Sequence, residues 1–330
     1  MESAREAMPD VHLPVNTVYP GGEERARWHL ERGRDTFTRV FGREPVGLWP
    51  SEGGVSQAAL ALFAEAGFRW AASGGSVLEN SHDAHSKSCS HRVYRFGDAP
   101  IDCAFRDDGL SDLIGFTYSD WHARDAVANL VGHMEHIAEL CPDREDCLIT
   151  IILDGENAWE YYPENGYYFL RDLYETLDAH PGLELTTFAS FLEGGDHAPA
   201  REEKLVAGSW VYGTFSTWIG DPEKNRGWEL LVEAKRCFDE QLASGKLSAD
   251  EIAAAEKQLA ICEGSDWFWW FGDYNPSATV SQFDQLYRMH LANLYQLINV
   301  EAPPHLGDII SHGGGQPSRG GVMRHHSEDS

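Results

Sequence analysis

Residues 147–160 read CLITIILDGENAWE, and the fold can be worked out from this stretch. Residues 148–153 form an unbroken apolar run rich in β-branched side chains, whose length suits a strand buried on both faces. The run ends abruptly at Asp154. In α/β sheets and barrels the carboxyl ends of the strands carry the chemistry, because there the backbone leaves the core and polar side chains can converge. The stretch therefore predicts a strand that delivers acidic side chains to a rim.

A second predicted strand also ends in an acid. Residues 46–49 are a short apolar run that continues into PSEGG at 50–54, ahead of a helical pattern at 57–66. If both strands are parallel members of one sheet, Glu52 and Asp154 emerge on the same side. Two carboxylates facing each other are the minimum apparatus for cleaving a glycosidic bond, since one attacks or stabilises the anomeric carbon and the other protonates the leaving oxygen.

Each of these acids also has a purely structural interpretation. Glu52 could stabilise the start of the helix at 57–66 through the helix dipole. Asp154 could cap the next helix. Glu160 and Glu156 compete with Asp154 for the role of the acid. Flat aromatic faces beside carboxylates suit a sugar ring, which makes Trp159 a candidate for binding sugar.

The composition limits the partners of the chain. At 330 residues we expect one large domain and a smaller appendage. The net charge is −27, which argues against nucleic acid or an anionic membrane surface as partner and favours a neutral substrate. No apolar run reaches 18 residues and residues 1–10 are polar, so we expect a soluble, cytoplasmic protein with no membrane partner.

The cysteines and histidines do not form a metal-binding pattern. Six cysteines are scattered without a CxxC pair, so we expect free thiols and neither a disulfide framework nor a thiolate zinc site. His82, His85 and His91 lie in a polar loop where a metal site is conceivable, but a solvated loop is the better interpretation. No cofactor and no metal are expected.

The order of the predicted elements changes near residue 204. Before it, strands are predicted at 46–49, 68–73, 93–96, 101–105, 148–153 and 183–187, alternating with helices at 23–41, 57–66, 118–140 and 167–177. After it, helices are predicted at 223–242, 249–262 and 282–298. Residues 1–19 are predicted to be irregular. The predicted domains are thus 1–204, 205–300 and a flexible tail at 301–330.

Four motifs in this order resemble glycoside hydrolase family 57, in its amylopullulanase-like and α-amylase-like branch. They are GLWPSEGGVS (47–56), ILDGENAWEYYPENG (152–166), GSWVYGTFSTWIGDPEKNRGWELL (208–231) and EGSDWFWWFGD (263–273). The resemblance covers residues 19–304. It implies an α/β fold, here a partial (β/α)7-type barrel followed by an α-helical C-terminal domain, and a retaining mechanism on α-glucans.

The resemblance also implies roles for individual residues. Glu52 corresponds to the nucleophile and Asp154 to the general acid/base, with Glu156 as a hydrogen-bond partner. The SDWFWW motif supplies substrate contacts, which makes Asp266, Trp267 and Trp270 candidates for binding sugar. Trp49 joins them from the first motif. Arg106 and Asp112, in FRDDGLSD after a predicted strand, either line the cleft or form a structural ion pair.

The chain departs from the family at its beginning. The His-Gln-Pro signature of the first barrel strand is absent, and only about 50 residues precede Glu52. We therefore expect a truncated chain that lacks the N-terminal part of the barrel. The leading hypothesis is a retaining glycoside hydrolase or transglycosylase that binds an α-linked oligo- or polysaccharide. The alternatives are a non-catalytic carbohydrate-binding fragment and a metal-dependent deacetylase on a related barrel. The oligomeric state is not indicated.

Overall fold

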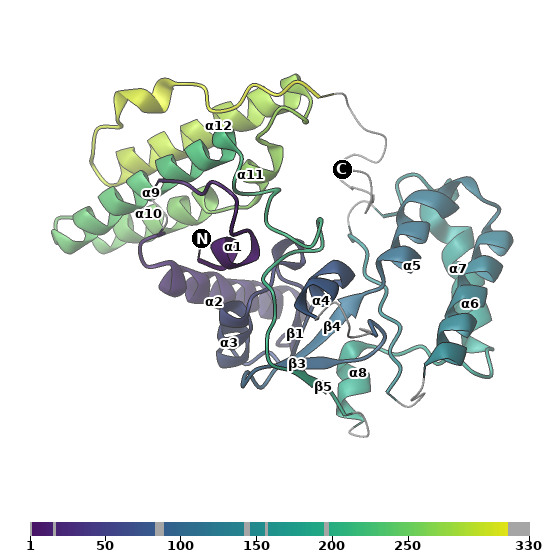
Figure 1. Cartoon of the computed structure of the whole chain (residues 1–330). Helices are drawn as coiled ribbons and strands as arrows, with labels where there is room; N and C mark the ends of the chain where they lie inside the picture. The colour runs from purple at the N-terminus through teal and green to yellow at the C-terminus, as the bar shows by residue number, and fades with distance from the viewer. Residues whose placement is uncertain are drawn as a thin grey trace. The chain divides into compact units, whose positions relative to one another are not determined.

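The computed structural model of the chain describes residues 2–15, 18–82, 89–141, 146–155, 158–194 and 198–315. These residues form two compact units, one within 34–213 and the other made of residues up to 33 together with 214–315 (Figure 1). The domain boundaries expected at 204/205 and 300/301 stay a prediction. The two compact units show which residues pack together, and this does not test where a domain begins or ends. Most of the expected tail, 316–330, lies outside the described residues.

A five-stranded sheet organises the 34–213 unit. Its strands are β1 (Gly47–Leu48), β2 (Trp70–Gly74), β3 (Tyr94–Phe96), β4 (Asp102–Arg106) and β5 (Ala200–Glu202), in the order β1-β2-β4-β3-β5. β1, β2 and β4 run parallel, whereas β3 is antiparallel to β4 and parallel to β5. Every residue of β4 is buried, including the charged Asp102 and Arg106 at its two ends, which form ion pairs. The predicted α/β class is confirmed.

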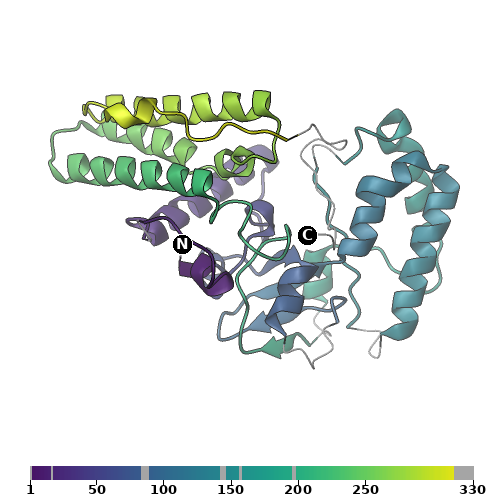
Figure 2. The ribbon, with the colours of Figure 1, turned by 45° about the horizontal axis from the view of Figure 1, so that its top comes forward.

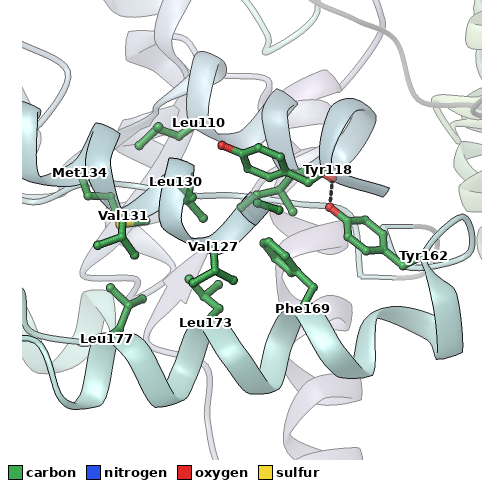
Figure 3. Packing of buried hydrophobic residues seen from close by; sticks show 12 residues of the cluster. Leu110, Tyr118, Val127, Leu130, Val131, Met134, Tyr162, Phe169, Leu173 and Leu177 are labelled. Carbon is green, nitrogen blue, oxygen red and sulfur yellow. Dashed lines mark hydrogen bonds between the residues drawn. The ribbon is translucent and has the colours of Figure 1, made fainter. Parts of the chain in front are cut away.

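Helices and helical turns connect the strands of this unit. They are η1 (Ser51–Gly53), α3 (Gln57–Glu65), α4 (Gly75–Ser81), α5 (Asp108–Asp112), η2 (Leu113–Thr117), η3 (Tyr118–Asp120), α6 (Ala123–Leu140), η4 (Pro163–Gly166), α7 (Tyr167–Asp178) and α8 (Phe188–Glu193). The apolar faces of α6 and α7 pack against each other around Leu130 and Phe169, as Figure 3 shows. The dashed line in Figure 3 is the hydrogen bond that the Tyr162 hydroxyl donates to the carbonyl of Ile114. This pairing forms a hydrophobic core beside the sheet.

The other unit is helical. It contains α1 (Glu2–Ala7), the first part of α2 (Gly22–Phe41), α9 (Pro222–Ala243), α10 (Ala249–Cys262), α11 (Asp266–Trp270), α12 (Ser277–Leu297) and η5 (Pro304–Gly307). The long helices α9, α10 and α12 lie side by side (Figure 2). The buried ammonium group of Lys224 donates to the carbonyls of Phe268 and Phe271, each at 2.6 Å, and so joins α9 to α11.

Two predicted strands do not form. Residues 148–154 join no strand ladder. They meet their neighbours through isolated hydrogen bonds, from the Leu148 amide to the His91 carbonyl and from the Asp107 amide to the Thr150 carbonyl. Residues 183–187 likewise have no strand partner among the described residues. The predicted helix at 118–140 begins at Ala123, after η3, and the N-terminal region expected to be irregular contains α1.

None of the helices in the described parts of the chain combines the length and the apolar content that crossing a membrane requires.

A buried carboxylate ties the N-terminal part of the helical unit to the end of α10. Glu263 is the C-cap residue of α10, and its side chain is 9% exposed. It accepts hydrogen bonds from Tyr19 at 2.6 Å and Arg25 at 2.8 Å, and lies 2.8 Å from His29. Burial alone would raise the pKa of Glu263, but the bonds from His29, Arg25 and Tyr19 outweigh it and lower the pKa to about 2. The carboxylate is therefore stabilised in the folded state.

Replacing Glu263→Gln tests this linkage. An acid whose pKa is lowered by folding stabilises the fold above its unfolded pKa and loses this contribution as the pH falls toward its folded pKa. We expect urea unfolding at pH 7 to show a loss on the order of 3 kcal/mol, because each pKa unit corresponds to about 1.4 kcal/mol. The difference from the parent should shrink between about pH 4.5 and pH 2. The exposed Glu240→Gln on α9 is the control, and an equal loss at both ends of the pH range would contradict the linkage.

Candidate active site

Three parallel strands bring polar and aromatic residues to one edge of the sheet. β1, β2 and β4 point the same way, so their carboxyl ends share that edge. Gly74 at the end of β2 is in register with Arg106 at the end of β4. The segment Trp49–Glu52 follows the end of β1 directly. The candidate nucleophile and Arg106 thus lie at the same edge of the sheet, on the parallel strands β1 and β4 that flank β2.

Glu52 sits in a tight, strained turn. Its backbone has φ 54° and ψ 29°, the left-handed region that non-glycine residues rarely adopt. The next residue, Gly53, has φ +60°, and a side chain there would come within 2.7 Å of the Trp49 ring. The Ser73 hydroxyl donates to the Gly53 carbonyl at 2.6 Å and fixes the turn against β2. Helix α3 starts only at Gln57 and is capped by Ser56, so Glu52 is not a first-turn acid of that helix.

Trp210 holds the carboxylate of Glu52. Its indole N–H donates to Glu52 Oε2 at 2.8 Å, and its backbone N–H donates to the Glu52 carbonyl at 3.2 Å. The rings of Trp49 and Trp210 meet edge to face, with centroids 5.5 Å apart. Val55 and Gly208 exchange two backbone hydrogen bonds, which anchor the segment that carries Trp210. Trp210 was not among the predicted site residues, although the GSWVYG motif contains it.

Arg106 connects Trp210 with the segment that leads to Asp154. The residue is 5% exposed, and its guanidinium lies 5.0 Å from the Trp210 ring centroid. It forms ion pairs with Asp108 at 2.8 Å and with Asp112 at 2.7 Å. Its Nε–H donates to the carbonyl of Ile152 at 2.9 Å. The structural ion pair that we considered for Arg106 and Asp112 is present, and it lies within the same cluster as Glu52 and Trp210.

The segment that ends at Asp154 is fixed to the end of β4 and to α5 by three hydrogen bonds. Besides the bond from Arg106 to Ile152, the Asp107 amide donates to the Thr150 carbonyl at 2.8 Å, and the Ile152 amide donates to the Ser111 hydroxyl at 3.3 Å. Asp154 follows Ile152 by two residues and is partly buried. Residues 158–162 form turns and η4 begins at Pro163, so the described residues contain no helix directly after Asp154 for it to cap.

Trp159 and Glu156 are the two remaining predicted site residues of the DGENAWE stretch. Trp159 packs on Tyr162 and Phe169, with ring centroids 5.3 and 6.1 Å away, in the core between α6 and α7. Glu156 lies outside the described residues. Their roles in binding sugar stay predictions.

The candidates from the SDWFWW motif belong to the helical unit. Trp267 donates to the Ile261 carbonyl at 2.8 Å and packs against Tyr287 of α12. Trp270 stacks on Phe283, with centroids 5.0 Å apart, whereas Asp266 is exposed. These contacts account for the two tryptophans as packing residues of α11 on α12.

The histidines of the polar region have carboxylate neighbours. His91 Nε2 lies 2.7 Å from Asp107 Oδ2, and His82 Nδ1 lies 3.7 Å from Glu202 Oε1. Burial would raise the pKa of Asp107, but the hydrogen bond with His91 contributes most to a net lowering. Among the described residues, which exclude His85, histidine, cysteine and acidic side chains form no group of three or more that could hold a metal ion.

The sequence profile of the family described as glycosyl hydrolase family 57 matches residues 13–206. The chain therefore belongs to glycosyl hydrolase family 57. No curated protein matches the sequence.

Several solved structures share the fold. The GH57 branching enzyme of the archaeon Thermococcus kodakaraensis aligns with a TM-score of 0.64 at 17% identity, over 83% of this chain and 62% of that one. The α-amylase AmyC of Thermotoga maritima aligns with 0.63 at 14% identity, over 85% and 64%. The 4-α-glucanotransferase of Thermococcus litoralis aligns with 0.61 at 15% identity, over 86% and 46%. This chain thus spans less than two thirds of the length of these structures.

Substituting Gly74→Ala tests the close approach between β2 and Trp210. An added Cβ would lie 2.5 Å from Trp210 Cα, so the Trp210 segment must move. We expect a loss of about 1–3 kcal/mol in the free energy of unfolding, together with a change in tryptophan fluorescence, because overpacking forces backbone shifts. The matched control is Gly132→Ala, on α6, where nothing lies within 4 Å of the new methyl group. The free energy of unfolding of that control should stay unchanged or rise by about 0.5–1 kcal/mol. An equal change in the free energy of unfolding for both variants would refute the close approach of Trp210 to Gly74.

Proposed function

We propose that the chain is a retaining glycoside hydrolase or transglycosylase acting on α-glucans, with Glu52 as nucleophile and Asp154 as general acid/base. The observation that carries the proposal is the placement of Glu52, in a strained turn at the carboxyl end of β1 with its carboxylate held by Trp210. Strained backbone of this kind clusters at active sites, although Glu164 and Tyr212 of this chain have it as well. Membership of glycosyl hydrolase family 57 supports the class of reaction.

The proposed mechanism has two steps. The Glu52 carboxylate attacks the anomeric carbon while protonated Asp154 donates its proton to the departing glycosidic oxygen. Asp154 then acts as base toward the acceptor, which attacks the glycosyl-enzyme and releases Glu52. A water acceptor gives hydrolysis and a sugar hydroxyl gives transfer. Retention requires the two carboxyl groups to be about 5–5.5 Å apart in the working enzyme.

The surroundings of Glu52 suit a neutral sugar. The charge of Arg106 is matched by Asp108 and Asp112, so it is not available as a cation for an anionic substrate. The partly exposed indole of Trp49 offers an apolar face next to the carboxylate. The large negative charge of the chain disfavours anionic partners such as nucleic acid. A cytoplasmic location is part of the same proposal.

Glu52→Gln and Asp154→Asn test the two acids. We expect each to lower kcat on maltoheptaose by at least about a hundredfold, because each removes a group that acts in the transition state. The exposed Glu139→Gln and Asp178→Asn variants are matched controls and should keep parental rates. Near-parental turnover in either site variant would refute its assignment. Binding of maltoheptaose by the parent chain without any product would instead indicate a non-catalytic carbohydrate-binding protein.

Added azide separates the two roles. With Glu52→Ala, azide can occupy the space of the carboxylate and attack an activated α-glucosyl fluoride directly, so the glucosyl azide should have the inverted configuration. With Asp154→Ala, azide attacks the glycosyl-enzyme formed on Glu52, so the product should retain its configuration. If instead Glu52→Ala gave the retained product and Asp154→Ala the inverted one, Asp154 would be the nucleophile and Glu52 the general acid/base.

Trp210→Phe tests the positioning of Glu52. The variant keeps an aromatic ring against Trp49 but loses the indole N–H that donates to Glu52 Oε2. A hydrogen bond to a charged group contributes about 1.5–3 kcal/mol, so we expect kcat to fall about ten- to a hundredfold, with a smaller change in KM. Trp159→Phe, in the core between α6 and α7, is the matched control. A larger effect on KM than on kcat would assign Trp210 to substrate binding instead.

A further inference from the structure

Three of the six cysteines gather in the sheet-containing unit, near the start of the segment that leads to Asp154. The sulfur atoms of Cys141 and Cys147 are 2.7 Å apart, and both residues are partly exposed. Cys89 is close enough to both to affect their ionisation. All six cysteines of the structure are free thiols. The family assignment and the proposed reaction make no use of this cluster.

Hydrogen bonds hold the main chain at Cys141 and Cys89 and at the residue next to Cys147. The Cys141 amide donates to the Ile137 carbonyl at 3.0 Å, at the end of α6. The Leu148 amide donates to the His91 carbonyl at 2.8 Å, which fixes the residue next to Cys147. The Tyr94 hydroxyl bonds both the amide and the carbonyl of Cys89, at 3.3 and 2.8 Å. The approach of the thiols therefore follows from the fold of the main chain.

The two sulfurs of the close pair differ in acidity. Burial raises the pKa of Cys141 to about 12, and the neighbouring thiols Cys147 and Cys89 raise it as well. Burial also leaves the pKa of Cys147 raised above its ordinary value, although the hydrogen bond donated by Cys141 offsets part of this effect. The hydrogen bond donated by Cys141 thus favours the thiolate at Cys147, and the thiolate is the reactive form.

We propose that Cys141 and Cys147 are a modification site at which a peroxide forms an intrachain disulfide. A disulfide requires the sulfurs to approach from 2.7 Å to about 2.05 Å, which is a small movement of two partly exposed side chains. The bond would link the end of α6 to the start of the segment that Arg106 holds. This inference does not depend on the proposed glycosidase activity.

The reaction balances with hydrogen peroxide as oxidant. The Cys147 thiolate attacks one peroxide oxygen, so that an S–O bond forms, the O–O bond breaks and the departing hydroxide takes up a proton as water. Cys141 then loses its proton and attacks the sulfenic sulfur, so that the S–S bond forms and the second oxygen leaves as water. The two sulfurs lose two electrons in total, and one peroxide is reduced to two waters.

The test treats the full chain with a small excess of hydrogen peroxide and counts thiols after unfolding. We expect the six thiols to fall to four, dithiothreitol to restore all six, and the rate to rise between pH 7 and pH 9 as more thiolate forms. Peptide mapping without reduction should show Cys141 joined to Cys147. Cys89→Ser and the control Cys237→Ser, on α9 of the helical unit, should each fall from five thiols to three.

Two outcomes would overturn the proposal. The first is that six thiols persist in the parent chain after treatment that oxidises a free peptide dithiol. The second is a disulfide that peptide mapping assigns to Cys89, or a Cys89→Ser variant that still has five thiols after treatment. Because Cys→Ser changes only one atom, unfolding curves of the variants show directly whether folding itself has been affected.

Discussion

The arrangement of the candidate site depends on one buried cation. The guanidinium of Arg106 lies at the carboxyl end of β4, where it pairs with two aspartates, donates to a backbone carbonyl and lies against Trp210. Burying a guanidinium is costly unless its N–H groups find acceptors. Asp108, Asp112 and the Ile152 carbonyl must therefore stay where they can accept these hydrogen bonds. Through these partners Arg106 joins three stretches that are far apart in the sequence, namely 106–112, 150–154 and 208–211. Trp210 also donates its indole N–H to Glu52, and so holds the backbone turn that carries this carboxylate.

The parts of the fold that could be predicted from the sequence are those with a local signal. The short apolar run at 46–49 and the polar turn after it correctly indicated β1 and the exit of Glu52 from the sheet. The long amphipathic helices α2, α6, α7, α9, α10 and α12 were found because several turns of periodicity are hard to mistake. The short helices α4, α5 and α8 were missed, because one or two turns leave no periodic pattern.

The stretch that pointed to the fold, 148–153, shows where such inference stops. Its apolar, β-branched composition predicted a strand buried on both faces, but the segment forms no strand and only Leu148 and Thr150 are fully buried. Composition cannot tell whether a neighbouring strand is available to pair with, and here the hydrogen bonds go to a loop residue, a side chain and the end of β4. In the same way, the sequence could not show that Trp159 packs in the core between α6 and α7 or that Trp270 stacks on Phe283 of α12, because these contacts depend on helices that lie beside them in the fold. Trp210 was overlooked because its role depends on a partner 158 residues away.

The left-handed backbone of Glu52 has a thermodynamic consequence. Only glycine, and to a lesser degree asparagine and aspartate, adopt this conformation without strain, so glutamate at this position makes the turn less stable than it could be. Glu52→Gly would relieve this strain, so the turn holds a reserve of stability that its present residue leaves unused.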